Sequence, residues 1–204
     1  METSAHGWHL ELARVIERQA FPVEKFGHQP RLYALTKQVG AGLEYDDDVV
    51  YAAAFTHDLG VFIGHRPEDP KLLPAWDMIA YAVEKVPAML REVGFPEGKI
   101  DAVIECIKTH QPSFSTKTLE ATILRDADIL EQLGAVGILR TVCKVGRDTR
   151  FDTFTAAVRS LQKVVDGLPS MIELPTAQAL AEPRVETMRA WLAAVTSEAG
   201  SLLL

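Results

Sequence analysis

The stretch DDDVVYAAAFTHDLG, residues 46–60, decides the fold of this chain. The run that it opens, from Val49 to Phe62, is almost wholly apolar, and a helix that is apolar on every side is normally buried at the centre of a protein. The aspartates at 46–48 supply an N-cap and negative charge where such a helix starts. The run contains the doublet His57-Asp58. Burying these polar groups is costly unless they are paired or bind a metal.

Working outward from this stretch, the spacing of apolar residues is helical along the chain, and the alternation typical of strands is nearly absent. The 204 residues are 48% hydrophobic and 24% charged, which is typical of a globular protein. No repeat, low-complexity segment or shift in composition divides the chain, so we expect one all-α domain over residues 1–204. The helices are expected at about 6–20, 28–42, 49–62, 75–93, 98–110, 118–133, 138–145, 152–167 and 176–196, with a proline-rich loop at 64–74.

The charge balance limits the classes of partner. A net charge of −7 argues against nucleic-acid binding through general electrostatics, but a site can be locally basic and take an anionic small molecule. The start of the chain does not have the pattern of a signal peptide, and no stretch has the ~20 apolar residues of a membrane span. We therefore expect a cytoplasmic protein without a membrane partner. The sequence leaves the oligomeric state open, a homo-oligomer included.

The two cysteines, Cys106 and Cys143, lie among apolar residues and belong to no CxxC pair. This spacing argues against a zinc–thiolate site. We expect both to be buried free thiols.

Two further segments carry potential metal ligands on other helices. His28 lies early in the expected helix before the central one, and Asp128 lies in LRDADILEQLGAVGILR, residues 124–140. An isolated His-Asp doublet is more often a helix cap. Here, however, three helices each bring a potential ligand next to buried surface. Two imidazoles and two carboxylates suit Mn, Fe, Co, Ni or Mg better than a structural zinc.

The ordered set of His28, His57-Asp58 and Asp128 resembles the HD-domain superfamily of metal-dependent phosphohydrolases. Residues 124–140 are similar to the DADRLDALGAIGI signature of small bacterial members. The resemblance covers about residues 25–145 and implies an HD-type helical bundle with the metal site between central helices. The helices of about 150–198 would pack on this core.

The same resemblance implies an activity. It indicates a divalent-metal-dependent phosphohydrolase, in which one metal ion holds the water that attacks a small phosphate ester or nucleotide. The ligand in the DAD triplet is usually the second aspartate, which selects Asp128 and leaves Asp126 as a supporting or helix-start residue.

Further roles follow from the resemblance and from spacing. Asp58 would also accept a proton from the attacking water, and His110 or His65 would protonate the leaving group. His110 is alternatively a helix cap, and His65 a solvated loop residue. The expected phosphate-binding residues are Arg31, one turn after His28, and a basic stripe of Arg140, Lys144 and Arg147, whose alternative is a solvated face.

One departure from the family pattern bears on the number of metals. Relatives with a second metal usually carry a histidine where this chain has Asp77, and many have a His-His pair where it has Thr109-His110. This favours one ion and weakens both the cyclic-dinucleotide phosphodiesterase reading and the di-iron oxygenase reading. Two alternatives stay open: a non-catalytic metal- or nucleotide-binding module, and an HD-type di-iron oxygenase. We expect loops 61–76 and 111–118, together with the C-terminal helices, to set substrate specificity.

Overall fold

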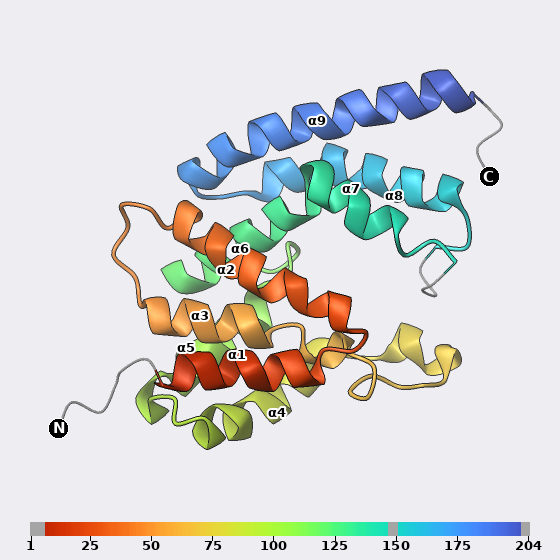
Figure 1. Ribbon diagram of the computed structural model, residues 1–204. Coiled ribbons are helices and arrows are strands. Elements are labelled where there is room, and N and C mark those ends of the chain that lie inside the picture. Colours follow the sequence, from red (N-terminus) through yellow and green to blue (C-terminus); the bar gives the residue numbers. More distant parts are fainter. Residues whose placement is uncertain (1–6, 147–150, 201–204) are drawn as a thin grey trace. The chain divides into compact units, whose positions relative to one another are not determined.

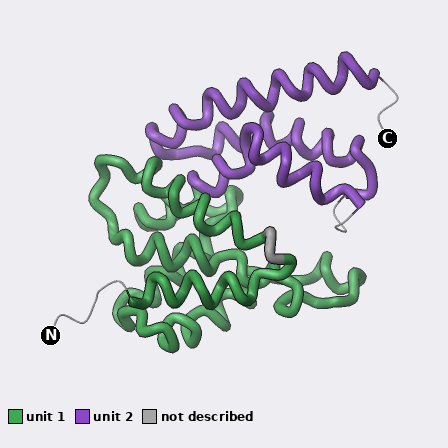
Figure 2. Tube along the Cα trace, in the orientation of Figure 1, with its two compact units in different colours: residues 1–125 green, residues 126–204 purple. Residues whose placement is uncertain are grey.

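A computed structural model describes residues 7–146 and 151–200 (Figure 1). Within these ranges all regular elements are helices, apart from one isolated bridge between Ile63 and Arg66, so the all-α prediction is confirmed. The chain divides into two compact units, one ending at Arg125 and one starting at Asp126 (Figure 2). A single domain over residues 1–204 stays a prediction.

The first unit is built around α3 (Asp47–Thr56), which packs against α1, α2 and α5, while α4 packs on α5. Residues 49–56 are all buried, as the apolar run predicts. The other elements of this unit are α1 (Gly7–Gln19), η1 (Val23–Gly27), α2 (His28–Val39), η2 (Leu59–Val61), η3 (Pro70–Ala75), α4 (Met78–Glu92), η4 (Glu97–Lys99), α5 (Ile100–Thr109) and the first half of α6 (Leu119–Gln132), where η marks a short 3-10 helix.

Helix α3 begins where the sequence predicts but ends earlier. Asp46 Oδ1 accepts hydrogen bonds from the backbone N–H groups of Asp48 (3.1 Å) and Val49 (3.4 Å), which confirms the predicted N-cap. The helix ends at Thr56 instead of continuing to Phe62, so that prediction is wrong. After it the backbone bends into η2, and Gly60 approaches the first turn of α4 so closely that an added Cβ would lie 2.7 Å from the Met78 carbonyl oxygen. The bend is thus accompanied by close packing of Gly60 on the backbone of α4.

The other helix starts of this unit also use side-chain caps. Asp77 Oδ1 accepts from the N–H groups of Ile79 and Ala80 at the start of α4. Thr118 Oγ1 accepts from Ala121 N–H at the start of α6. The loop expected at 64–74 contains η3, because Asp69 caps a turn whose first residue is Pro70.

The second unit contains the end of α6, α7 (Gly134–Val142), α8 (Phe154–Gly167), η5 (Leu168–Met171) and α9 (Pro175–Ala199). Helices α7, α8 and α9 pack pairwise. Helix α7 begins at Gly134 and includes Gly137, four residues before the start that the sequence predicts at about 138. A Cβ on Gly137 would lie 2.1 Å from the Gln132 carbonyl oxygen, so this turn requires glycine.

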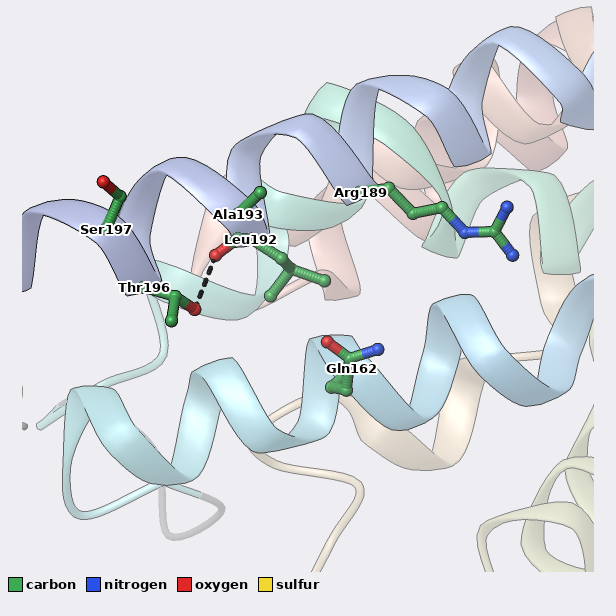
Figure 3. Close-up of a pocket in the computed structure, with 6 residues that line it drawn as sticks. All are labelled: Gln162, Arg189, Leu192, Ala193, Thr196 and Ser197. Atoms are coloured by element: carbon green, nitrogen blue, oxygen red, sulfur yellow. Dashed lines mark hydrogen bonds between the residues drawn. The ribbon is translucent and has the colours of Figure 1, made fainter. Parts of the chain in front are cut away.

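A pocket of about 470 Å³ lies between α8 and α9 (Figure 3). Figure 3 shows Gln162 on α8 and the other lining residues on α9, where the Thr196 hydroxyl donates to the Leu192 carbonyl (2.9 Å). Arg189 is the one ionisable side chain among the six residues that line it. The pocket therefore offers no acid–base pair or ligand cluster for chemistry.

The two cysteines differ in exposure. Both are free; Cys106 is buried and burial raises the pKa of its thiol to about 12. Cys143 is exposed, contrary to the sequence-based expectation, because it lies just past the end of α7. Of the helices that the structure describes, none combines the length and apolarity that crossing a membrane requires.

Candidate metal centre

Three side chains of the first unit bring their ligand atoms together. They are His28, the first residue of α2, and the doublet His57-Asp58 that follows α3. His28 Nε2 lies 3.4 Å from His57 Nε2, and each of these nitrogens lies 3.7 Å from Asp58 Oδ2. A triangle with these edges has its centre about 2.1 Å from each corner, which matches metal–nitrogen and metal–oxygen bond lengths in protein sites.

The electrostatics of this cluster also fit a cation. His28 and His57 are 6% and 1% exposed. His57 Nδ1 lies 3.1 Å from the Ala54 carbonyl and donates to it, which leaves the lone pair on the Nε2 atom that faces the cluster. Two imidazole nitrogens and a carboxylate oxygen at these distances repel one another unless a proton or metal ion lies among them. The donor set therefore fits a divalent ion.

The early end of α3 lets both members of the doublet reach one point. On a continuous helix adjacent side chains point about 100° apart. Here His57 is the C-cap residue, and Asp58 has φ −95° and ψ 14°, outside the helical region. The sequence placed both residues on one helix, which is wrong for Asp58. The bend of the backbone turns its carboxylate toward the histidines.

His110 adds a third imidazole to the cluster. Its ring centroid lies 5.0 Å from that of His57, and the side chain is 4% exposed. Its Nδ1 donates to the Ile107 carbonyl (2.7 Å), so Nε2 is the nitrogen left for another partner. His110 is also the C-cap residue of α5, so the two roles expected of it are compatible.

His65 lies in the loop after η2 and is half-buried. Its Nδ1 shares a hydrogen bond with the Tyr81 hydroxyl (2.9 Å), and desolvation lowers the pKa of its imidazole. His65 is therefore not fully solvated, which was the alternative to its role as an acid. Sequence reasoning missed Tyr81, because the proline-rich loop between the two residues gives no spacing signal.

Arg31 extends from the first turns of α2 back toward its start. A Cβ on Gly27 would lie 2.9 Å from Arg31 Nη1, so the guanidinium lies beside the residue that precedes His28. The Arg31 side chain is exposed.

The two aspartates of the DAD triplet have different surroundings within the second unit. Asp126 is fully buried, and its Oδ2 accepts from the backbone N–H groups of Glu173 (3.0 Å) and Leu174 (2.7 Å), just before α9. It supports α9 and does not start a helix. Asp128 is half-buried and accepts from Gln132 Nε2 (3.3 Å). Its role as a metal ligand stays a prediction.

The expected basic stripe is not formed by one helix. Arg140 lies in α7 and its Nη1 donates to the buried Glu131 carboxylate (3.1 Å). Helix α7 ends at Val142, before Lys144, where the backbone changes to i→i−3 hydrogen bonds. The helical spacing assumed for Lys144 is therefore wrong, and Arg147 lies outside the described residues. Phosphate binding by these three residues stays a prediction.

Replacing Gly60 with alanine tests the packing that shapes the doublet. We expect a loss of about 2 kcal/mol in unfolding free energy, because the new methyl group would meet the Met78 backbone, which cannot move aside as a side chain can. Urea denaturation measures this loss. Gly98→Ala is the matched control, since nothing lies within 4 Å of its added Cβ. Equal midpoints for the two variants would contradict this account of the bend.

The chain is similar to a known protein family and to several solved structures. The family model described as HD domain matches residues 26–133. The crystal structure of Bacillus subtilis YpgQ in complex with ADP is 25% identical, with a TM-score of 0.71, and 96% of each chain is covered. An HD-superfamily hydrolase from Bacillus thuringiensis is 19% identical, with a TM-score of 0.68 and 95% of each chain covered. The Lin1889 protein from Listeria innocua is 18% identical, with a TM-score of 0.71, covering 98% of this chain and 99% of its own. No protein of curated function matches the chain.

Proposed function

We propose that this chain, which belongs to the HD domain family, is a divalent-metal-dependent phosphohydrolase. The observation that carries the proposal is the cluster of His28 Nε2, His57 Nε2 and Asp58 Oδ2, whose spacing fits a metal ion. When bound, the ion would lower the pKa of a coordinated water and polarise a phosphoryl oxygen. The reaction would break a phosphate ester or phosphoanhydride bond.

The residues around the cluster take the remaining roles. Asp58 has a second carboxylate oxygen that would accept the proton of the attacking water. His110 is the better placed of the two candidate acids, because its ring lies 5.0 Å from His57 while its Nδ1 is held by a carbonyl. His65 is the second candidate, and its lowered pKa makes it a weaker cation at neutral pH. Arg31 would bind a phosphate oxygen near the start of α2.

The fourth ligand and the additional phosphate contacts are proposed from the family pattern. Asp128 would complete the ligand set from α6. Positive side chains that would bind the phosphate groups of the substrate are those of Arg140, Lys144 and Arg147. Asp77, in the position of the second-metal histidine, caps α4 through its carboxylate, which supports a single ion per chain.

A nucleotide is the substrate class that we favour. YpgQ, which is similar to this chain over nearly its full length, was crystallised with ADP. A nucleotide carries both the phosphates that a metal centre binds and a base that a neighbouring pocket can recognise. Although the chain is acidic overall, a few basic side chains near the site would attract such an anion.

Metal analysis combined with a phosphate-release panel tests the proposal. Metal-free protein is loaded with Mn²⁺, Co²⁺, Ni²⁺ or Mg²⁺ and incubated with nucleoside mono-, di- and triphosphates and simple phosphate esters. We expect one ion per chain, phosphate or pyrophosphate release with at least one metal, and loss of release on chelation. His57→Ala should lose both the ion and the activity.

The same measurements separate the alternatives. Metal-dependent thermal stabilisation without turnover of any substrate would contradict the hydrolase and favour a binding module. Two irons per chain with oxygen consumption would favour a di-iron oxygenase.

A further inference from the structure

A pocket of about 360 Å³ lies in the first unit, within the size range of small-molecule sites. One wall comes from residues 74–79, which lead into α4. The other comes from Lys108, Gln111 and Phe114, at the end of α5 and in the loop after it. Five of the lining residues, those at 74–76, 111 and 114, fall in the loops 61–76 and 111–118 that are expected to set specificity.

The pocket is joined to the metal centre on both sides. Gln111 directly follows His110, whose ring lies beside that of His57. Trp76 Nε1 donates to the Gly60 carbonyl (2.8 Å), two residues after Asp58. Since successive Cα atoms are 3.8 Å apart, Gly60 lies within about 8 Å of Asp58 along the backbone. Two segments of the chain, 58–60 and 110–111, therefore carry both residues of the metal centre and residues that line or support the pocket.

The aromatic walls are held in place. The indole of Trp76 is fixed by its hydrogen bond to Gly60 and lies against Tyr81, with ring centroids 5.2 Å apart. Phe114 is 46% exposed, yet its backbone is anchored at both polar groups: its N–H donates to the Gln111 carbonyl, and its carbonyl accepts from the buried Arg125. A Trp or Phe ring has only two side-chain torsions, so it loses little conformational entropy when it binds a flat ligand.

Two polar side chains complete the pocket. Among the described residues, the side chains of Lys108 and Gln111 have no hydrogen-bond or ion-pair partner, whereas Asp77 uses its carboxylate to cap α4. An amide offers both a donor and an acceptor, and an ammonium offers three donors. Together with two aromatic rings, these groups suit a flat heterocycle that has polar atoms along its edge.

We propose that this pocket binds the base of a nucleotide, which stacks on Phe114 while Gln111 and Lys108 contact its polar edge. The inference rests on the proposed function, because it requires the phosphates of the same molecule to lie at the metal centre. It goes further by assigning base recognition to the loops around Trp76 and Phe114.

Two non-hydrolysable probes test the assignment. α,β-Methylene-ADP carries a base, and methylenediphosphonate carries the same bridged phosphates without one. Titration calorimetry is performed on the full chain loaded with Mn²⁺. Phe114→Ala should weaken α,β-methylene-ADP binding by roughly 5- to 100-fold, the range for losing one base–aromatic stack, and leave methylenediphosphonate binding within about twofold. Gln111→Leu should weaken only the nucleotide probe, by about 2- to 10-fold.

A control variant and the possible outcomes make the test decisive. Phe154→Ala removes a phenylalanine of similar exposure, 50%, from α8 and should change neither affinity. Unchanged nucleotide affinity in both Phe114→Ala and Gln111→Leu would overturn the base pocket and leave the hydrolase proposal intact. Equal weakening of both probes would also overturn it, since the pocket would then hold phosphate. If the unaltered chain binds neither probe, the proposed function itself fails.

Discussion

Asp58→Asn is expected to lower phosphate release by roughly 10²- to 10⁴-fold, the range for losing a general base, because the same substitution also weakens a metal ligand. The substitution keeps the shape of the side chain but removes the negative charge that faces His28 Nε2 and His57 Nε2 at 3.7 Å. It weakens metal binding and leaves no strong proton acceptor beside the cluster. Steady-state release with the preferred metal measures the effect.

The unfolding temperature shows whether Asp58→Asn impairs metal binding alone or also destabilises the fold. Metal-free Asp58→Asn should unfold close to the temperature of the unaltered metal-free chain, because asparagine keeps the size and shape of a side chain that is only partly buried. The rise in unfolding temperature on adding metal should be lost. Asp101→Asn, an exposed position in the first turn of α5, is the matched control and should keep activity. Full activity in Asp58→Asn would contradict the assignment of this cluster as the catalytic metal centre.

Asp126→Ala is expected to cost about 2–6 kcal/mol of unfolding free energy. The buried carboxylate accepts from two backbone N–H groups that precede α9, at 3.0 and 2.7 Å. Removing it leaves both donors without this acceptor, at about 1–3 kcal/mol for each group that is left unsatisfied. Urea denaturation followed by circular dichroism measures the change.

Two comparisons make this result specific to Asp126. Asp166→Ala removes an exposed carboxylate of α8 that pairs with Gln162, and should cost less than about 1 kcal/mol. Asp126→Asn keeps one accepting oxygen and should fall between the two. A midpoint for Asp126→Ala equal to that of Asp166→Ala would mean that the buried contacts before α9 contribute nothing measurable.

The contrast between Asp126 and Asp128 shows where sequence reasoning stops. The two residues share one triplet and one helix, and the sequence distinguishes them only through the family pattern. The structure shows that the buried carboxylate of Asp126 holds the backbone 47 and 48 residues further along the chain. No local spacing predicts that contact, because it depends on how α6 and α9 pack.

Local chemistry was enough to predict several features correctly. The apolar run of α3, its Asp46 cap and the all-helical architecture follow from hydrophobicity and from short-range hydrogen bonds. These features depend on residues within a few positions of one another. The family was recognisable for a related reason, since its ligands have fixed types in a fixed order.

Tertiary structure decided the features that depend on long-range contacts. Helix α3 ends at Thr56, and the approach of Gly60 to the Met78 backbone helps to turn the chain at that point. That bend brings the Asp58 carboxylate to the same point as the two imidazoles, which a continued helix would not do. In DDDVVYAAAFTHDLG the sequence by itself determined which residues are buried and which ligands are present. Packing between segments distant in sequence determined where the ligand atoms lie.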